Sequence, residues 1–146
     1  MKNNFLVDTN FLLALVLITH PLHEKAKAFY DQNASRCTFL ICRSVQISFL
    51  RLLTQKIDRI YKPLNNSEAI IELNKMLDMP SFLYIEDSKK LLKNWFSFGK
   101  HHNASPNLWM DAYLSYFAVK NNLELLTFDK GFLQWKNKAL VVQLIK

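Results

Sequence analysis

Short, continuously apolar runs recur along the chain, and they predict buried β-strands. The first is FLVD (5–8), in which three apolar residues precede an acid. Runs without a polar face are typical of strands that are covered on both sides of a sheet. The predicted strands span residues 5–8, 38–42, 82–85, 123–128 and 140–144.

Between these runs, apolar residues recur at helical spacing, and most such segments start at a residue that can cap a helix. The clearest case follows Ser44, where Val45, Phe49 and Leu52 are three or four residues apart. The predicted helices run from Thr9 or Asn10 to about Thr19, from Pro21 through HEKAKAFYDQ, from Ser44 to Gln55, from Ser67 to Pro80, from Asp87 to about Lys100, and from Ser105 to about Asn121.

Strands and helices therefore alternate. This alternation predicts right-handed β-α-β units and an α/β fold, with a central parallel sheet of about five strands that is covered on both faces. The length of 146 residues suits one domain, which we expect to span residues 1–146. Sheets of this kind bind their ligands at the carboxyl ends of the strands.

Composition narrows the possible functions. The formal net charge of +7 favours a polyanionic partner. Only two glycines occur, which nearly excludes a glycine-rich loop that cradles phosphates. Cys37 and Cys42 have no Cys or His companions at zinc spacing, and we expect buried thiols in a reducing compartment. The run FLLALVLI is too short to span a bilayer, so we expect a soluble, cytoplasmic protein with no membrane partner.

Three of the twelve acids fall among residues that should be buried. Asp8 ends the first strand, Asp111 lies inside an apolar, aromatic helix, and Asp129 follows LLTF. Converging carboxylates raise one another's pKa values unless a hard cation such as Mg²⁺ offsets their charges. Such an ion can generate a hydroxide and stabilise the leaving oxygen of a phosphodiester. The three acids therefore predict a metal-dependent phosphodiesterase.

Each acid also has an ordinary structural explanation. Asp8 could cap the helix that follows it, Asp129 could form an Asp-Lys-Gly turn, and Asp111 could pair with an arginine. These explanations weaken when the acids are taken together, because the predicted fold brings at least Asp8 and Asp129 to one edge of the sheet.

The acids lie within a series of ordered blocks, which are FLVDTNFLLAL, SVQISFLRLLTQ, SPNLWMDAYLSYFAV and LLTFDKGF. These blocks resemble the PIN-domain ribonucleases, specifically the VapC-type toxins of bacterial toxin–antitoxin pairs, from about residue 4 to residue 144. The last two blocks are the most specific. The resemblance implies a three-layer α/β/α sandwich and an Mg²⁺-dependent endoribonuclease, with Mn²⁺ as a substitute ion. It also implies an RNA substrate, a homodimer, and a VapB-like antitoxin whose peptide occupies the active-site groove.

The same resemblance assigns roles to individual residues. Asp8, Asp111 and Asp129 would be catalytic metal ligands, the last of them directly or through a water. Asn10 would orient Asp8, and Thr127 would form a hydrogen bond within the site.

Position 46 departs from the family pattern. Many PIN domains have a glutamate at the start of the helix after the second strand, where this chain has Gln46. Glutamine keeps a carbonyl oxygen but loses the charge, so the site would carry about three negative charges and support a single Mg²⁺ more easily than two. We expect Gln46 to belong to the catalytic set, binding a metal-bound water or orienting the nucleophile in a working but slower nuclease. The alternative is a polar residue that faces solvent.

Basic and aromatic residues could contact the RNA. Arg43, Arg51 and Lys130 are candidate phosphate contacts, although each could equally be a solvated charge, or a structural ion pair for Arg51. Trp109 and Tyr113 could stack a base, but aromatic residues at helical spacing more often belong to a core.

Three other functions compete with the nuclease. A phosphatase of the haloacid-dehalogenase type would need a second aspartate two residues after Asp8, where Asn10 stands instead. A non-catalytic or attenuated RNA-binding PIN domain would follow from the loss of the glutamate at Gln46. A pure interaction module would act only through assembly with its antitoxin.

Overall fold

One parallel sheet organises residues 3–56 and 62–146, which are the residues that the computed structural model describes. Its five strands stand in the order β3-β2-β1-β4-β5, and every neighbouring pair is parallel. The strands are β1 (Asn3–Val7), β2 (Cys37–Ile41), β3 (Phe82–Tyr84), β4 (Glu124–Thr127) and β5 (Val142–Leu144). The predicted α/β fold with a parallel sheet of about five strands is confirmed.

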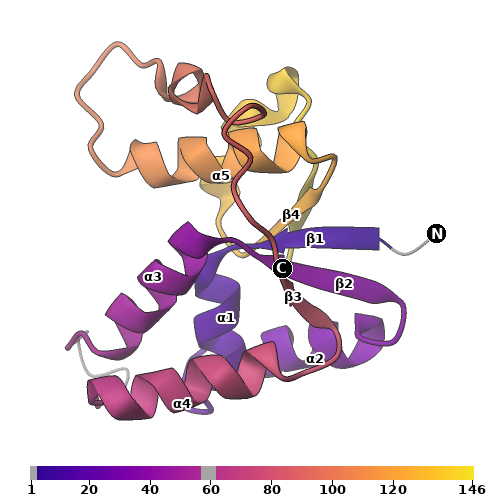
Figure 1. The fold of residues 1–146 in the computed structure, drawn as a ribbon, viewed down its shortest axis with the longest axis vertical. Helices are drawn as coiled ribbons and strands as arrows, with labels where there is room; N and C mark the ends of the chain where they lie inside the picture. The colour runs from indigo at the N-terminus through magenta and orange to yellow at the C-terminus, as the bar shows by residue number, and fades with distance from the viewer. Residues whose placement is uncertain (1–2, 57–61) are drawn as a thin grey trace.

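Helices cover both faces of the sheet (Figure 1). One side carries α1 (Thr9–Val16), α2 (His23–Asn33), α3 (Arg43–Leu53) and α4 (Asn66–Leu77). The other side carries α5 (Leu108–Lys120) with two 3₁₀ segments, η1 (Trp95–Gly99) and η2 (Lys130–Lys138). Right-handed crossovers require this division, because the chain first moves from β1 towards β3 and then returns across the sheet to β4 and β5. The implied three-layer sandwich is therefore confirmed as well.

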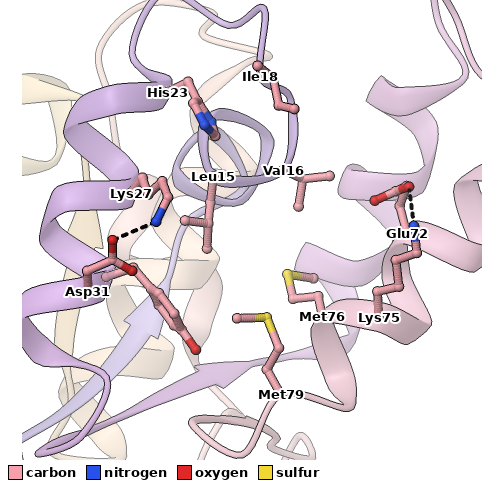
Figure 2. A pocket seen from close by; sticks show the side chains of 11 residues that line it. Leu15, Val16, Ile18, His23, Lys27, Asp31, Glu72, Lys75, Met76 and Met79 are labelled. Carbon is pink, nitrogen blue, oxygen red and sulfur yellow. Dashed lines mark hydrogen bonds and ion pairs between the residues drawn. The ribbon is translucent and has the colours of Figure 1, made fainter.

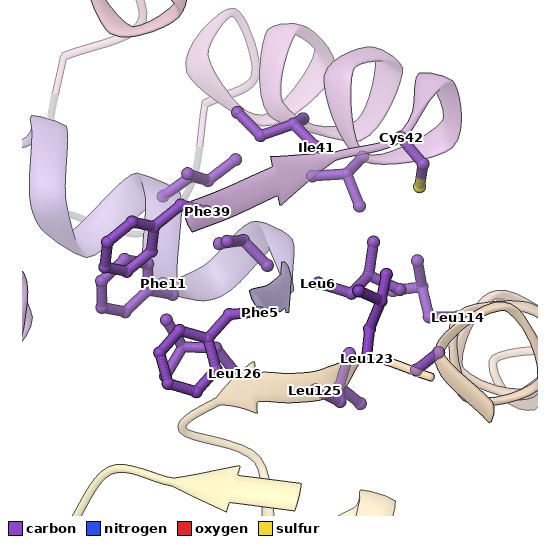
Figure 3. Packing of buried hydrophobic residues seen from close by; sticks show 14 of the residues in the cluster. Phe5, Leu6, Phe11, Phe39, Ile41, Cys42, Leu114, Leu123, Leu125 and Leu126 are labelled. Carbon is purple, nitrogen blue, oxygen red and sulfur yellow. The ribbon is translucent and has the colours of Figure 1, made fainter. Parts of the chain in front are cut away.

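Aromatic side chains fill part of the core beneath the sheet (Figure 3). The ring centroid of Phe39 lies 5.8 Å from that of Phe5 and 6.2 Å from that of Phe11. Leu6 points to the opposite face of β1, near Leu114 of α5, because successive side chains of a strand alternate. Both faces of β1 are thus buried, which explains why its last three residues, Phe5 to Val7, are all apolar.

The predicted helix from Asp87 to about Lys100 is wrong. This segment forms turns and then η1, whose aromatic side chains pack edge-on against α5. The rings of Trp95 and Tyr113 are 5.5 Å apart between centroids, and those of Phe98 and Tyr116 are 5.1 Å apart. Contacts with α5, rather than an apolar stripe at helical spacing, therefore fix the conformation of this segment.

Gly99 ends η1 at a point where a larger residue would not fit. A Cβ atom at this position would overlap the ring of Trp109. The adjoining Phe98 carbonyl oxygen accepts a hydrogen bond from Trp135 Nε1 at 2.9 Å, which ties η1 to η2.

The helix boundaries also differ from the predicted ones. Three predicted starts, at Ser44, Ser67 and Ser105, are not the caps. The cap positions of α1, α3, α4 and α5 are occupied by Asp8, Cys42, Asn65 and Asn107. Thr9 and Asn10 therefore lie inside α1, which ends at Val16 rather than near Thr19.

Cys37 and Cys42 are buried, free thiols, as predicted. Within residues 3–56 and 62–146, no helix combines the length and the hydrophobicity needed to cross a bilayer.

Candidate active site

The carboxyl ends of β1 and β4 lie side by side where the strand order of the sheet reverses. The chain proceeds from β1 outwards to β2 and β3, and β4 later pairs with the other edge of β1. Open α/β sheets bind their ligands at such a switch point. Asp8 follows β1 and Asp129 follows β4, so the predicted convergence of these two acids at one edge is confirmed.

Asp8 is held at this edge by its backbone and by its side chain. Its N–H donates to the Leu126 carbonyl oxygen at 3.0 Å, which continues the pairing with β4. Its Oδ1 atom accepts from the Thr9 N–H at 2.8 Å and caps α1, so the capping explanation holds alongside the placement at the sheet edge. The residue is only 8% exposed, and burial raises the pKa of its carboxyl from 3.8 to about 6.

Thr127 connects Asp8 to Asp129. The Thr127 hydroxyl is completely buried, donates to Asp8 Oδ2 at 2.7 Å, and accepts from the Asp129 N–H at 3.0 Å. Asn10 Oδ1 lies 3.5 Å from the same hydroxyl. Thr127 and Asn10 thus surround Asp8, which is where residues that orient a carboxylate must lie.

Asp129 is exposed and forms the Asp-Lys-Gly turn that the sequence suggested. Its Oδ1 atom accepts from the Gly131 N–H at 2.7 Å and caps η2. Its Oδ2 atom has no hydrogen-bond donor among the described residues, so one carboxylate oxygen remains available for a ligand.

Asp111 lies in the first turn of α5, on the opposite side of the sheet from α1. Burial, and then the negative charges of Asp8 and Asp129, raise the pKa of its carboxyl from 3.8 to about 7. The arginine partner proposed as an alternative is absent, since the ion pairs of the described residues are Lys27–Asp31 and Lys75–Glu72. The three carboxylates therefore influence one another, and none of them forms an ion pair within the described residues.

The donors at this edge fit a hard divalent cation, because all three are carboxylates and such ions bind oxygen ligands. Within the described part of the chain, however, no three Asp, Glu, His or Cys side chains stand close enough together to hold a metal ion. The acids are near enough to raise one another's pKa values without forming a cage. An open set of carboxylates suits Mg²⁺, which keeps several of its waters.

Gln46 lies in the first turn of α3 and is 7% exposed, so the alternative of a solvent-facing side chain is wrong. Its Oε1 atom accepts from Arg43 Nη1 at 3.0 Å. The Arg43 guanidinium also lies over the ring of Tyr84, 4.6 Å from the ring centroid. The oxygen that could face a metal is therefore engaged, and the amide group of Gln46 remains as a hydrogen-bond donor.

The other two candidate phosphate contacts lie in different places. Lys130 is exposed and adjoins Asp129 at the start of η2. Arg51 lies near the end of α3, donates to Gln55 Oε1 at 3.2 Å, and lines a hollow against α4. The structure thus places Lys130 at the acidic edge, whereas it places Arg51 more than two helical turns along α3 from Arg43.

Most of the chain matches one known domain family. The model of the PIN domain matches residues 5–138. The chain belongs to the PIN-domain family. The resemblance of the sequence to this family is therefore confirmed.

Relatives of this PIN domain carry the name of the VapC ribonucleases. Ribonuclease VapC41 of Mycobacterium tuberculosis is 35% identical over 134 residues, which cover 89% of this chain and 92% of the relative. Ribonuclease VapC31 of the same organism is 29% identical over 130 residues, which cover 88% and 90%.

Solved structures of similar proteins show the same fold. VapBC2 from Rickettsia felis, bound to a DNA fragment from its promoter, superimposes with a TM-score of 0.69 at 14% identity and covers 98% of this chain and 99% of that chain. VapC20 of Mycobacterium tuberculosis, a toxin that cleaves the sarcin-ricin loop, gives a TM-score of 0.67 at 16% identity and covers 90% and 94%.

A hollow of about 440 Å³ lies between the N-terminal turns of α3 and α5 in this PIN domain. Arg43 lines it from α3, Trp109 and Tyr113 line it from α5, and Asp87 and Trp95 line it from the segment before α5. Trp109 is 50% exposed and so is not a core residue. Sequence reasoning missed Asp87 and Trp95, because it assigned both to a helix that does not form.

A groove lies away from the acids, between α1, α2 and α4 (Figure 2). Met76 and Met79 line it together with Leu15 and Val16, and the Lys27–Asp31 ion pair stands at its rim. Charged side chains such as Glu72 and Lys75 also line it, and methionine-rich surfaces are common at binding sites for varied partners.

Proposed function

We propose that this PIN domain is an Mg²⁺-dependent endoribonuclease, with Mn²⁺ as a substitute ion, and the toxin of a VapBC-type toxin–antitoxin system. One observation carries the proposal. Asp8 at the switch point of the sheet and Asp111 on α5 are carboxylates whose pKa values are raised, first by burial and then by the charges of neighbouring carboxylates. The names of the VapC relatives support ribonuclease action on RNA.

A bound Mg²⁺ would supply a water of lowered pKa and would offset charge on the phosphodiester. Asp8, Asp111 and Asp129 would hold the ion through carboxylate oxygens. Thr127 orients Asp8 by donating to its Oδ2 atom, and thereby keeps one carboxylate in position as the substrate binds. Lys130 would contact a phosphate beside the acids.

The role of Gln46 follows from its contacts. Because Arg43 occupies the Gln46 oxygen, the amide N–H groups of Gln46 are the atoms that can orient a water or a phosphate oxygen. Arg43 in turn keeps a guanidinium at the start of α3, where it would contact the RNA backbone.

The direct test is RNA cleavage with Mg²⁺ or with EDTA, by the wild type, Asp8→Asn and Asp111→Asn. Asp31→Asn serves as the matched control, because it makes the same chemical change at an exposed ion pair on α2. We expect cleavage by the wild type and the control, loss with EDTA, and loss in the two site variants. RNA binding without cleavage by all four proteins would refute the nuclease.

That last result would favour the second candidate, a non-catalytic or attenuated RNA-binding PIN domain. The observation behind it is that position 46 carries no charge and that its oxygen is already bonded to Arg43.

Partners follow from the same proposal. We propose a cytoplasmic homodimer that is held by a VapB-like antitoxin, and the Rickettsia felis VapBC2 structure supports the antitoxin. A basic side chain of the antitoxin would offset the acids electrostatically. Co-expression with the antitoxin should yield a complex in which RNA cleavage is suppressed, and light scattering on the free chain should give twice the monomer mass.

A further inference from the structure

The hollow between α3 and α5 has aromatic walls. The ring centroid of Trp95 lies 6.2 Å from that of Trp109 and 5.5 Å from that of Tyr113, with the planes nearly perpendicular. Half of the Trp109 surface remains exposed, so part of this ring is free to contact a ligand. Exposed aromatic rings of this kind stack the bases of single-stranded RNA.

Two opposite charges line the same hollow without pairing. Arg43 and Asp87 form no ion pair with each other, because the ion pairs of the described residues lie on α2 and α4. Gln46 and the ring of Tyr84 hold Arg43 in place, and these contacts use only part of its five N–H donors. The hollow therefore offers a fixed donor group and a carboxylate acceptor at once.

We propose that this hollow binds a guanine base of the RNA substrate. Guanine alone among the four bases presents two adjacent donors, N1–H and the 2-amino group, and a carboxylate such as Asp87 can accept both. Its O6 and N7 atoms are acceptors, and a guanidinium such as that of Arg43 can donate to them. Adenine and cytosine place one donor next to one acceptor on the same edge, so they would satisfy Asp87 only partly.

The location of the hollow links this base to the site. Arg43 lines the hollow and is bonded to Gln46 on α3, whereas Trp109 and Tyr113 are each two residues from Asp111 and lie on another face of α5. A base in the hollow would therefore be linked to the proposed catalytic set through Arg43 and Gln46. The inference rests on the proposed function for its RNA ligand, but base binding does not require cleavage.

The test measures binding without cleavage. Fluorescein-labelled uridine hexamers with a central guanosine, inosine, adenosine or uridine are titrated with the protein in EDTA, and their anisotropy is recorded. We expect the guanosine hexamer to bind about tenfold more tightly than the adenosine hexamer, at the lower end of what a bidentate base contact provides. The inosine hexamer should be intermediate, because inosine lacks the 2-amino group.

Two variants with the same change of charge separate base recognition from general electrostatics. Asp87→Asn should reduce the preference for guanosine over adenosine to less than about threefold, because its amide accepts only one of the two bonds. Glu86→Gln, an exposed neighbour that does not line the hollow, should keep the preference of the wild type.

The inference would be overturned by equal affinity for all hexamers or by no binding of any of them. An equal loss of the guanosine preference in Asp87→Asn and Glu86→Gln would overturn it as well. Equal affinities that Asp87→Asn and Trp109→Leu leave unchanged would show that the RNA binds outside the hollow. Cleavage with Mg²⁺ is measured separately on the same wild-type protein. Guanine recognition can therefore fail while the nuclease stands, and the nuclease can fail while guanine recognition stands.

Discussion

Removing the charge of Asp8 should stabilise the metal-free protein while abolishing its chemistry. The pKa of Asp8 rises from 3.8 to about 6 on folding, chiefly because the carboxyl is buried. Between these two values the folded state binds more protons than the unfolded state, so the free energy of unfolding falls as the pH rises. The stabilisation from the protonated group is complete below pH 3.8 and is lost as the pH passes about 6.

The magnitude follows from the size of the shift. About two pKa units at about 1.36 kcal/mol each give a penalty of about 3 kcal/mol at pH 8, and the same linkage gives about 1 kcal/mol at pH 4.5. Asp8→Asn removes this penalty, and it keeps an acceptor for the Thr9 N–H. The variant also weakens the bond with Thr127, at a cost of about 1 kcal/mol. The net gain should be about 2 kcal/mol at pH 8 and about zero at pH 4.5.

Urea unfolding in EDTA, followed by tryptophan fluorescence at pH 8 and pH 4.5, measures both values. At pH 8 the gain corresponds to a rise in Tm of about 4–8 °C. Asp31→Asn is the control and should change little at either pH, because it breaks an exposed ion pair. Addition of Mg²⁺ should stabilise the wild type and not Asp8→Asn. A variant that is less stable than the wild type at both pH values, or a gain that does not shrink on acidification, would refute the reasoning.

Three further predictions concern single side chains. Gln46→Glu should tighten Mg²⁺ binding in calorimetry whereas Gln55→Glu, an exposed glutamine just past α3, should not; equal affinities would place position 46 outside the site. Thr127→Val should lower the free energy of unfolding by about 1–3 kcal/mol, because it removes the bond to Asp8 and leaves the Asp129 N–H without its acceptor; unchanged stability in urea would contradict this role. Ser115→Ala should raise the free energy of unfolding by about 1 kcal/mol, because the Ser115 hydroxyl is completely buried and has no hydrogen-bond partner among the described residues; a lower urea midpoint would show an unrecognised partner.

The sheet could be predicted from the sequence because its strands are buried on both faces. The apolar run that ends at Val7 suits a strand that is covered on both faces. The alternation of such strands with helices along the chain then favours parallel pairing between the strands. The acids could be predicted for a related reason, since Asp8 and Asp111 interrupt apolar segments where a charge is costly. Both inferences use only local sequence and the rule that ligands bind at strand ends.

The segment between β3 and α5 could not be predicted in the same way. Asp87 and Ser88 look like the start of a helix, and the Leu91 N–H does bond to Ser88 Oγ at 3.3 Å, but turns and then η1 follow instead of an α-helix. Its conformation depends on aromatic contacts with α5 and on the fit of Gly99 against Trp109. Such contacts join residues from separate elements, and a single sequence does not display them. For the same reason, the bond between Gln46 and Arg43 became visible only in the structure.

Asp8 shows why an acid at the end of a buried strand can serve folding and chemistry together. One of its oxygens caps α1, and this fixes the side chain at the sheet edge whether or not a ligand is bound. The other oxygen accepts from Thr127, which also holds the backbone of Asp129. The cap and the threonine both lower the pKa of Asp8, yet burial outweighs them and leaves it raised. The fold therefore maintains an unpaired negative charge that its own hydrogen bonds do not neutralise. A cation at this edge would relieve that penalty, so metal binding and folding stability should be coupled through Asp8.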